Sequence, residues 1–65
     1  MEITIESKYG KVIGEVIGNY SIRVYVEGEE YRGYCAINKN IKTVTDDDLL
    51  KACEEIMSRE IVEEE

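Results

Sequence analysis

Turn-forming glycines divide the first part of the chain into four short runs in which apolar and polar side chains alternate. Alternation with a period of two is typical of β-strands that have one buried face and one solvated face. The runs cover residues 2–7, 11–17, 20–27 and 30–38, and the connections between them are short. Parallel neighbours would need much longer crossover connections. The pattern therefore predicts an antiparallel four-stranded β-meander.

One amphipathic helix is expected after the strands, over residues 46–62. Thr45 is a favourable N-cap, and the aspartates that follow it suit the positive end of the helix dipole. Apolar side chains then recur at helical spacing and form one stripe: Leu49, Leu50, Cys53, Ile56, Met57 and Ile61. The stripe should cover the apolar face of the sheet. The sequence thus predicts a single α+β domain over 1–65, in the order β-β-β-β-α, that ends in an acidic tail at 63–65.

A two-residue turn at 28–29 would set the register between the third and fourth strands. The pairs expected on the apolar face are Ile22–Cys35, Val24–Gly33 and Val26–Tyr31. On the opposite face Arg23 would lie opposite Tyr34, and Tyr25 opposite Arg32. The alternation of side chains and the register set by the turn therefore give the same result. One face of these two strands is apolar, and the other carries two arginine–tyrosine pairs.

The second strand admits two registers. A two-residue loop before the third strand would place Glu15 in the core opposite Ile22, whereas a three-residue loop would place it outward beside Arg23. We prefer the outward position, because a buried carboxylate without a partner is costly. Ile13 and Ile17 would then lie on the outer face.

Composition and cysteine usage place the chain among small domains with one core. Its 65 residues are 43% hydrophobic and 35% charged, which is typical of a globular protein. The start of the chain resembles no signal peptide and no apolar run could span a bilayer, so we expect a cytoplasmic location without membrane contact.

Cys35 and Cys53 fall at predicted core positions. Free thiols are the simpler interpretation in a reducing compartment, and a bridge between them is the alternative.

The residue types argue against catalysis, metal binding and cofactor binding. Histidine is absent, which removes the most common general base and the usual activator of serine or cysteine nucleophiles. Successive residues of a helix point about 100° apart, so the aspartates at 46–48 cannot converge on one ion. The glycines separate strands and do not open a helix, as a phosphate-binding loop requires. We expect a protein that is not an enzyme.

The entire net charge of −7 belongs to the predicted helix and the residues after it. Residues 1–45 hold six acids and six bases, whereas residues 46–65 hold nine acids and two bases. An i,i+4 stripe of alternating sign would stabilise the helix and account for part of this charge: Asp47, Lys51, Glu55 and Arg59. The acids proposed as a binding surface are Asp46, Asp47, Asp48, Glu54, Glu55 and Glu60.

Carboxylates on a rigid helix can imitate the phosphates of a nucleic acid. They also steer association with a basic partner. Our first hypothesis is therefore a phage or mobile-element type inhibitor whose acidic helix occupies the basic nucleic-acid-binding groove of a target protein. Direct binding of nucleic acid is not expected at a pI near 4.5.

The outer sheet face is the second candidate surface. Tyrosine and arginine are enriched at protein interfaces, and this face combines them with an apolar pair from the second strand. Its polar members are Arg23, Tyr25, Arg32 and Tyr34. The alternative hypothesis is a homo-oligomerising or adaptor protein, in which a homodimer would bury this face. Stacking of the pairs on an exposed sheet would equally explain them, at about 0.5–1 kcal/mol each.

Overall fold

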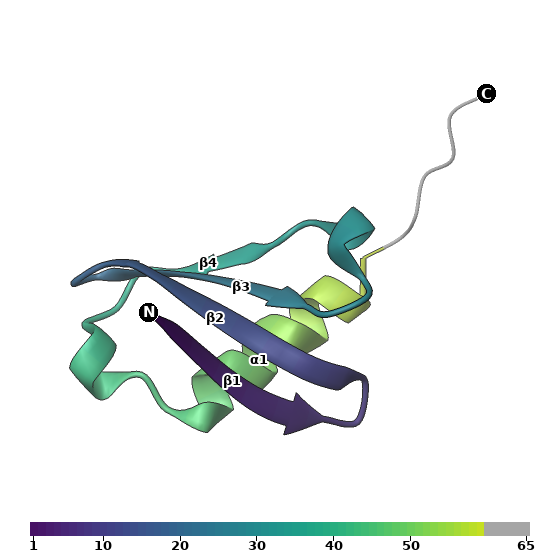
Figure 1. Cartoon of the computed structure of the whole chain (residues 1–65), viewed down its shortest axis with the longest axis horizontal. Helices are drawn as coiled ribbons and strands as arrows, with labels where there is room; N and C mark the ends of the chain where they lie inside the picture. Colours follow the sequence, from purple (N-terminus) through teal and green to yellow (C-terminus); the bar gives the residue numbers. More distant parts are fainter. Residues whose placement is uncertain (60–65) are drawn as a thin grey trace.

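The computed structural model describes residues 1–59 and consists of one antiparallel sheet followed by one α-helix (Figure 1). The strands are β1 (Glu2–Ser7), β2 (Gly10–Gly18), β3 (Ser21–Val26) and β4 (Cys35–Ile37), in the sheet order β1-β2-β3-β4. Two short 3-10 helices, η1 (Glu30–Arg32) and η2 (Ile41–Thr43), precede α1 (Asp46–Met57). The predicted α+β meander with a C-terminal helix is confirmed. Glu60, Ile61 and the predicted tail lie outside the described residues.

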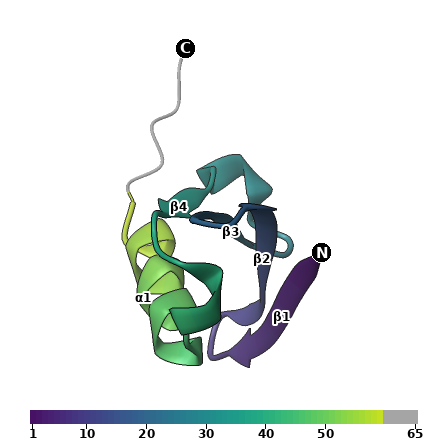
Figure 2. The same ribbon diagram turned by 90° about the vertical axis from the view of Figure 1, so that its left-hand side faces the viewer.

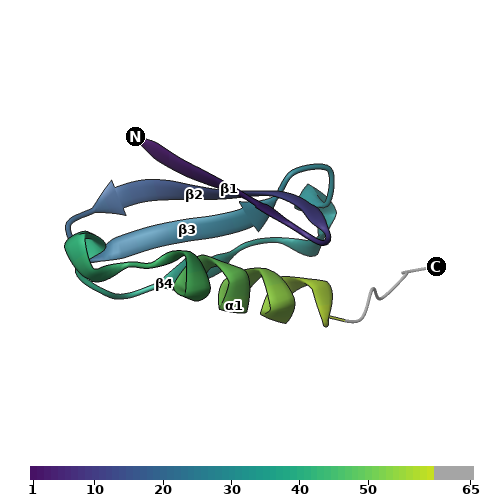
Figure 3. The same cartoon turned by 90° about the horizontal axis from the view of Figure 1, so that it is seen from below.

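Helix α1 covers one face of the sheet and leaves the other face open (Figures 2 and 3). It packs mainly against β3 and β4 and reaches β1 with fewer contacts. The core between the two layers is formed by Val12, Ile22, Val24, Val26, Leu49, Ala52, Cys53 and Ile56. Full burial of one such aliphatic side chain stabilises the fold by about 1.5–3 kcal/mol, so this cluster holds the two layers together. Ala52 was not in the predicted stripe, because alanine carries little periodic signal.

The predicted N-cap of α1 is confirmed as a complete capping box. The Thr45 hydroxyl accepts a hydrogen bond from the Asp48 backbone N–H at 3.4 Å, and the Asp48 carboxylate accepts one from the Thr45 N–H at 2.9 Å. The two bonds satisfy donors that the first turn of a helix leaves free. Lys39 adds a third contact, from its Nζ to the same Asp48 oxygen at 2.8 Å.

The helix ends earlier than predicted. It stops at Met57, and Ser58 closes the last turn by donating its hydroxyl hydrogen to the Glu55 carbonyl at 2.8 Å. The last turn contains no basic residue, although a helix C-terminus favours cations and disfavours acids. Glu54 and Glu55 in this turn therefore disfavour extension of the helix beyond Met57.

The register predicted between β3 and β4 is wrong by two residues. Ile22 pairs with Ile37 and Val24 with Cys35, and the fourth strand covers only Cys35–Ile37. The chain forms η1 where the strand was expected to begin. Local bonds favour this turn, because the Glu30 carboxylate accepts from the Gly28 N–H at 3.0 Å. A shift of two residues keeps each side chain on its face, so the predicted apolar face survives.

The preferred register of the second strand is confirmed. Glu15 lies opposite Arg23 and outside the core, and a carboxylate oxygen of Glu15 is 3.9 Å from Arg23 Nη1. The register shifts between Val16 and Gly18, which supplies the extra residue that the three-residue loop was expected to provide. Ile17 is left on the outer face with 53% of its surface exposed.

Candidate protein-binding surfaces

Arg23 and Tyr34 lie together on the outer sheet face. The guanidinium carbon of Arg23 lies 4.6 Å from the centroid of the Tyr34 ring, which is the geometry of a cation–π pair. The pair is diagonal, because the residue directly opposite Arg23 is Ala36. The predicted contact is therefore confirmed, although it arises from a different register. Tyr34 is 52% exposed, so its ring can still contact another molecule.

The predicted pair between Tyr25 and Arg32 is absent. Arg32 belongs to η1, where its Nε donates to Glu29 Oε1 at 3.1 Å. Its Nη1 donates to the Arg59 carbonyl at 2.8 Å, and Arg59 Nη1 donates back to the Arg32 carbonyl at 2.8 Å. Arg32 therefore joins η1 to the end of α1 and does not contribute to the outer face. The expected Tyr25–Arg32 pair does not form because residues 30–34 do not form a strand.

Carboxylates surround the remaining tyrosine of this face. Tyr25 is half-buried, and a shallow hollow of about 410 Å³ beside it is lined by Glu15, Arg23, Tyr25, Glu30, Gly33 and Tyr34. The pKa of Tyr25 is raised above 10.0, first by its partial burial and then by the negative charges of Glu2, Glu15, Glu30 and Glu27. The face is thus aromatic and acidic, with one arginine. Such a surface suits a cationic partner and opposes a nucleic-acid backbone.

Intramolecular contacts occupy several of the acids predicted to form the helical binding surface. Asp48 contacts Lys39 within the capping box, and Glu54 lies 3.7 Å from Lys8 Nζ. Glu55 accepts a hydrogen bond at 2.8 Å from the thiol of Cys35. These three carboxylates lie along the flanks of α1, where the loops and strands approach it. They are therefore less available to a partner than the sequence suggested.

Asp46 and Asp47 are acids of α1 whose carboxylates form no ion pair among the described residues. Both are exposed at its first turn. The i,i+4 ion pairs expected along the helix are not formed there either, and Arg59 donates to the carbonyls of Arg32 and Tyr34 and not to Glu55. Glu60 lies outside the described residues.

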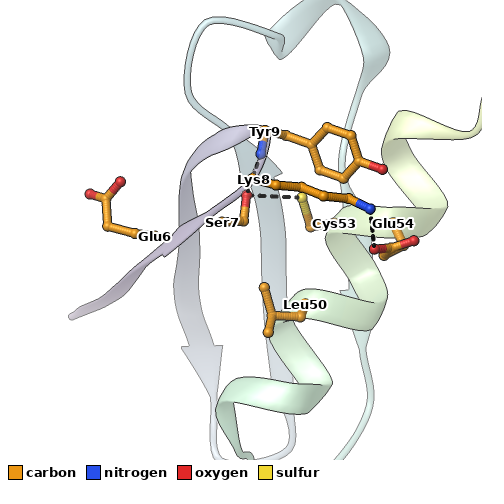
Figure 4. Close-up of a pocket in the computed structure, with 7 residues that line it drawn as sticks. All are labelled: Glu6, Ser7, Lys8, Tyr9, Leu50, Cys53 and Glu54. Atoms are coloured by element: carbon orange, nitrogen blue, oxygen red, sulfur yellow. Dashed lines mark hydrogen bonds and ion pairs between the residues drawn. The ribbon is translucent and has the colours of Figure 1, made fainter.

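A hollow of about 280 Å³ lies between the β1–β2 turn and α1 (Figure 4). Its lining is Glu6, Ser7, Lys8, Tyr9, Leu50, Cys53 and Glu54. Lys8 bridges its rim toward Glu54 and stacks 5.2 Å from the Tyr9 centroid. No local pattern in the sequence predicts this hollow, because its two walls are far apart in the chain and are brought together by packing alone.

The polar groups of this hollow are not arranged for nucleophilic chemistry. The neighbouring Tyr9 and then the carboxylate of Glu54 raise the pKa of Lys8 above 10.5, so its amine stays protonated at neutral pH. The single hydroxyl hydrogen of Ser7 goes to the Gly10 carbonyl at 2.8 Å, which leaves the buried Cys53 thiol to donate toward Ser7 Oγ at 3.8 Å.

The two cysteines are free thiols and differ in environment. Cys53 is buried, as predicted, whereas Cys35 is half-buried beside Glu55. Partial burial, and then the hydrogen bond to Glu55, raise the pKa of Cys35 above 9.0. A thiol is nucleophilic only as thiolate, so Cys35 is held in its unreactive form.

The described residues contain neither a candidate metal site nor a candidate membrane-spanning helix. Within residues 1–59, no group of three or more cysteine or acidic side chains is placed to hold a metal ion. In the same part of the chain, no helix is long and apolar enough to cross a membrane.

The comparisons with known proteins add no assignment: no family model, no curated protein and no solved structure matches this chain.

Proposed function

We propose that this protein is a non-catalytic, acidic protein-binding module whose helix α1 occupies a basic groove on a cytoplasmic partner. A groove that otherwise binds nucleic acid has the required charge, as in inhibitors of the phage or mobile-element type. One observation carries the proposal: α1, which holds five acids and one base, packs one side against the sheet and leaves its other side open to solvent.

The open side of α1 offers a specific seat for a basic side chain. A shallow hollow of about 400 Å³ is lined by Asp47, Leu50, Lys51 and Glu54. Asp47 and Glu54 are seven residues apart, or about 10.5 Å along the axis, and Leu50 lies between them on the same face. A partner lysine or arginine could lay its aliphatic stem on Leu50 and place its charged end at Asp47, or at Glu54 in exchange for the contact of Glu54 with Lys8. This arrangement favours a protein groove rich in such side chains.

Competition with DNA tests the proposal. Nucleic-acid-binding proteins from a cell extract are bound to DNA-cellulose, and the purified protein is added at low salt. We expect selective release of one protein, and no release by Asp47→Lys/Glu54→Lys. The matched control is Glu15→Lys/Glu27→Lys, which changes the net charge equally but on residues outside α1 and β1. Equal release by both double variants, or no release by the native protein, would contradict the proposal.

The outer sheet face supports a second candidate function, as an adaptor or homo-oligomerisation surface. The exposed Arg23–Tyr34 stack and the neighbouring Ile17 favour it, because solvent-exposed aromatic and aliphatic groups gain most from burial. The carboxylates around Tyr25 oppose the pairing of two copies and favour a foreign, cationic partner.

Light scattering at low and high salt separates the two versions of this function. A homodimer should form more readily at high salt, which screens the carboxylates, and Tyr34→Glu should convert it to a monomer of lower stability. A monomeric mass at both salts would exclude self-association and leave the adaptor version, for which Tyr34→Glu should weaken capture of the partner without changing the melting temperature.

A further inference from the structure

Strand β1 has one edge without a partner among the described residues. The Met1 carbonyl accepts a hydrogen bond from the Val16 N–H at 3.0 Å. This bond shows which residues of β1 direct their backbone N–H and C=O groups toward β2. In an antiparallel pair, every second residue directs its backbone groups to the neighbouring strand. The backbone groups that face away from β2 are therefore those of Glu2, Thr4 and Glu6, over nearly the full length of β1.

The opposite edge of the sheet is protected. Strand β4 has only three residues, and Ala36 alone turns its backbone groups outward there. The neighbouring Tyr34 carbonyl already accepts a hydrogen bond from Arg59 Nη2 at 3.1 Å. Short edges and covered edges are devices that prevent strand addition. The structure uses these devices at β4 and not at β1.

A strand added to β1 would meet different chemistry on its two faces. On the outer face, the side chains of Glu2 and Glu6 are exposed and flank Thr4. On the inner face, Ile5 and Leu50 are only half-buried, because α1 reaches β1 with few contacts. The hollow in Figure 4 continues this inner side at the end of β1. The edge therefore fits basic side chains that alternate with apolar ones.

The same charges disfavour a second copy of this chain as the occupant. Antiparallel pairing of two β1 strands about Thr4 would place Glu2 of one copy opposite Glu6 of the other, at both ends of the pair. Like charges directly opposite each other destabilise a sheet. The acids thus exclude self-addition while they attract a basic strand.

We propose that β1 binds an extended segment of a partner protein as a fifth strand, with lysine or arginine at alternate positions and β-branched apolar residues between them. Backbone hydrogen bonds to Glu2, Thr4 and Glu6 supply affinity, and the alternating side chains supply specificity. This site adjoins the open side of α1 and shares Leu50 with it, but depends on backbone groups that the helical surface does not use.

Hydrogen exchange of individual amides tests strand addition. The probe is the acetylated, amidated peptide Lys-Val-Lys-Val-Lys-Val-Lys, and the control peptide has glutamate in place of lysine. In the free protein the Thr4 and Glu6 amides should exchange fast, and those of Ile3 and Ile5 slowly. At a peptide concentration about ten times its Kd, exchange at Thr4 and Glu6 should slow about tenfold. The glutamate peptide should have no effect.

Proline at position 4 separates strand addition from charge attraction. Thr4→Pro removes only an outward N–H, which edge strands tolerate, and should abolish the peptide-induced protection of Glu6. Thr4→Val keeps the N–H and should preserve that protection. Should Thr4→Pro fail to fold, Glu2→Lys/Glu6→Lys provides the second test, because it should bind the glutamate peptide and lose the lysine peptide.

Two outcomes would overturn the inference. One is binding that Thr4→Pro leaves unchanged and that Asp47→Lys/Glu54→Lys abolishes, which would place the peptide on α1 and support only the proposed function. The other is slow exchange of the Thr4 and Glu6 amides in the free protein, which would show that this edge is already covered.

Discussion

At the scale of the residue, Asp48 connects three parts of the chain through one carboxylate. It accepts hydrogen bonds from the Thr45 backbone and hydroxyl, and from Lys39 before η2. These contacts, led by the bond from Lys39, lower its pKa below 3.8. A single side chain thus caps α1 and attaches the connector between β4 and the helix.

The lowered pKa of Asp48 gives a pH dependence with a defined sign. Its carboxylate stabilises the folded state fully above pH 3.8, and that stabilisation is lost as the pH falls through the lowered pKa of the folded state. Urea unfolding of Asp48→Asn should therefore show a smaller loss of stability between about pH 5 and pH 2 than the native protein. Asp46→Asn, outside the capping box, is the control. Identical pH slopes for all three proteins would contradict this role.

The hydroxyl of Thr45 should contribute a measurable part of the helix stability. Thr45→Ala removes the acceptor for the Asp48 N–H and should lower the free energy of unfolding by about 0.5–2 kcal/mol. Thr45→Ser keeps the acceptor and should lose less. Chemical denaturation of the three proteins measures the difference, and equal stability of the alanine and serine variants would count against the capping contact.

Titration of the tyrosines tests the acidic surroundings of Tyr25. Because partial burial, and then the neighbouring carboxylates, raise its pKa, Tyr25 should keep its phenol proton to higher pH than an ordinary tyrosine, and Glu15→Gln should lower that pKa. Glu6→Gln is the control, since Glu6 is not among those carboxylates. Ultraviolet absorbance of the phenolate follows the titration, and the part of the curve that Tyr25→Phe removes belongs to Tyr25. An unchanged curve for Glu15→Gln would show that Glu15 does not influence the ring.

At the scale of the secondary-structure element, a close approach between β2 and α1 depends on glycine. A Cβ at Gly14 would lie 3.1 Å from Leu49 Cδ2 and 3.3 Å from Ile22 Cγ2, both in the core. At Gly18, on the same strand, a Cβ would meet nothing within 4 Å. The helix therefore rests on the strand at a point where no side chain intervenes.

Valine substitutions measure this approach. Gly14→Val should lower the free energy of unfolding by about 1–3 kcal/mol through overpacking, although valine favours strands. Gly18→Val should change it by less than about 0.5 kcal/mol, because the site is open. Thermal unfolding gives both values. A tolerated valine at Gly14 would mean that α1 can shift away from β2 at little cost.

The success of the sequence-based predictions also differs by element. The meander, the N-cap and the position of Glu15 were predictable, because periodicity, capping chemistry and the cost of a buried charge are local signals. The turn around η1 was not, because its residues alternate as a strand does and only their local hydrogen bonds make a turn. Of the candidate sites, the shared face of Arg23 and Tyr34 was predictable because a shift of two residues keeps it, although the predicted pairing was not the observed one. The hollow beside Lys8 depends on how the β1–β2 turn packs against α1.

At the scale of the whole molecule, negative charge gathers in two regions. One is the open side of α1 and the other is the outer face around Tyr25, where the acids come from β1, β2 and the residues after β3. The ion pairs in the described residues are spread singly over the surface, and most of their side chains are exposed. Exposed pairs of this kind contribute little, so repulsion should dominate the electrostatics of folding.

Salt should therefore stabilise this protein. Raising sodium chloride from about 0.01 M to about 0.2 M shortens the screening length from about 30 Å to below 10 Å and weakens repulsion within each region. We expect a higher melting temperature in the added salt, and a smaller rise for Asp47→Asn/Glu54→Gln. A melting temperature that falls with salt would show that the ion pairs outweigh the repulsion.

A sheet that is covered on one side only also predicts how the molecule should respond to systematic mutation. Inward positions such as Val24 should reject most substitutions in any assay, because folding itself depends on them. Outward positions such as Thr4 and Arg23 should tolerate replacement when cellular abundance is selected. The same positions can become intolerant when biological activity is selected. The difference between the tolerance measured for abundance and the tolerance measured for activity would then identify the partner-binding surface without knowledge of the partner.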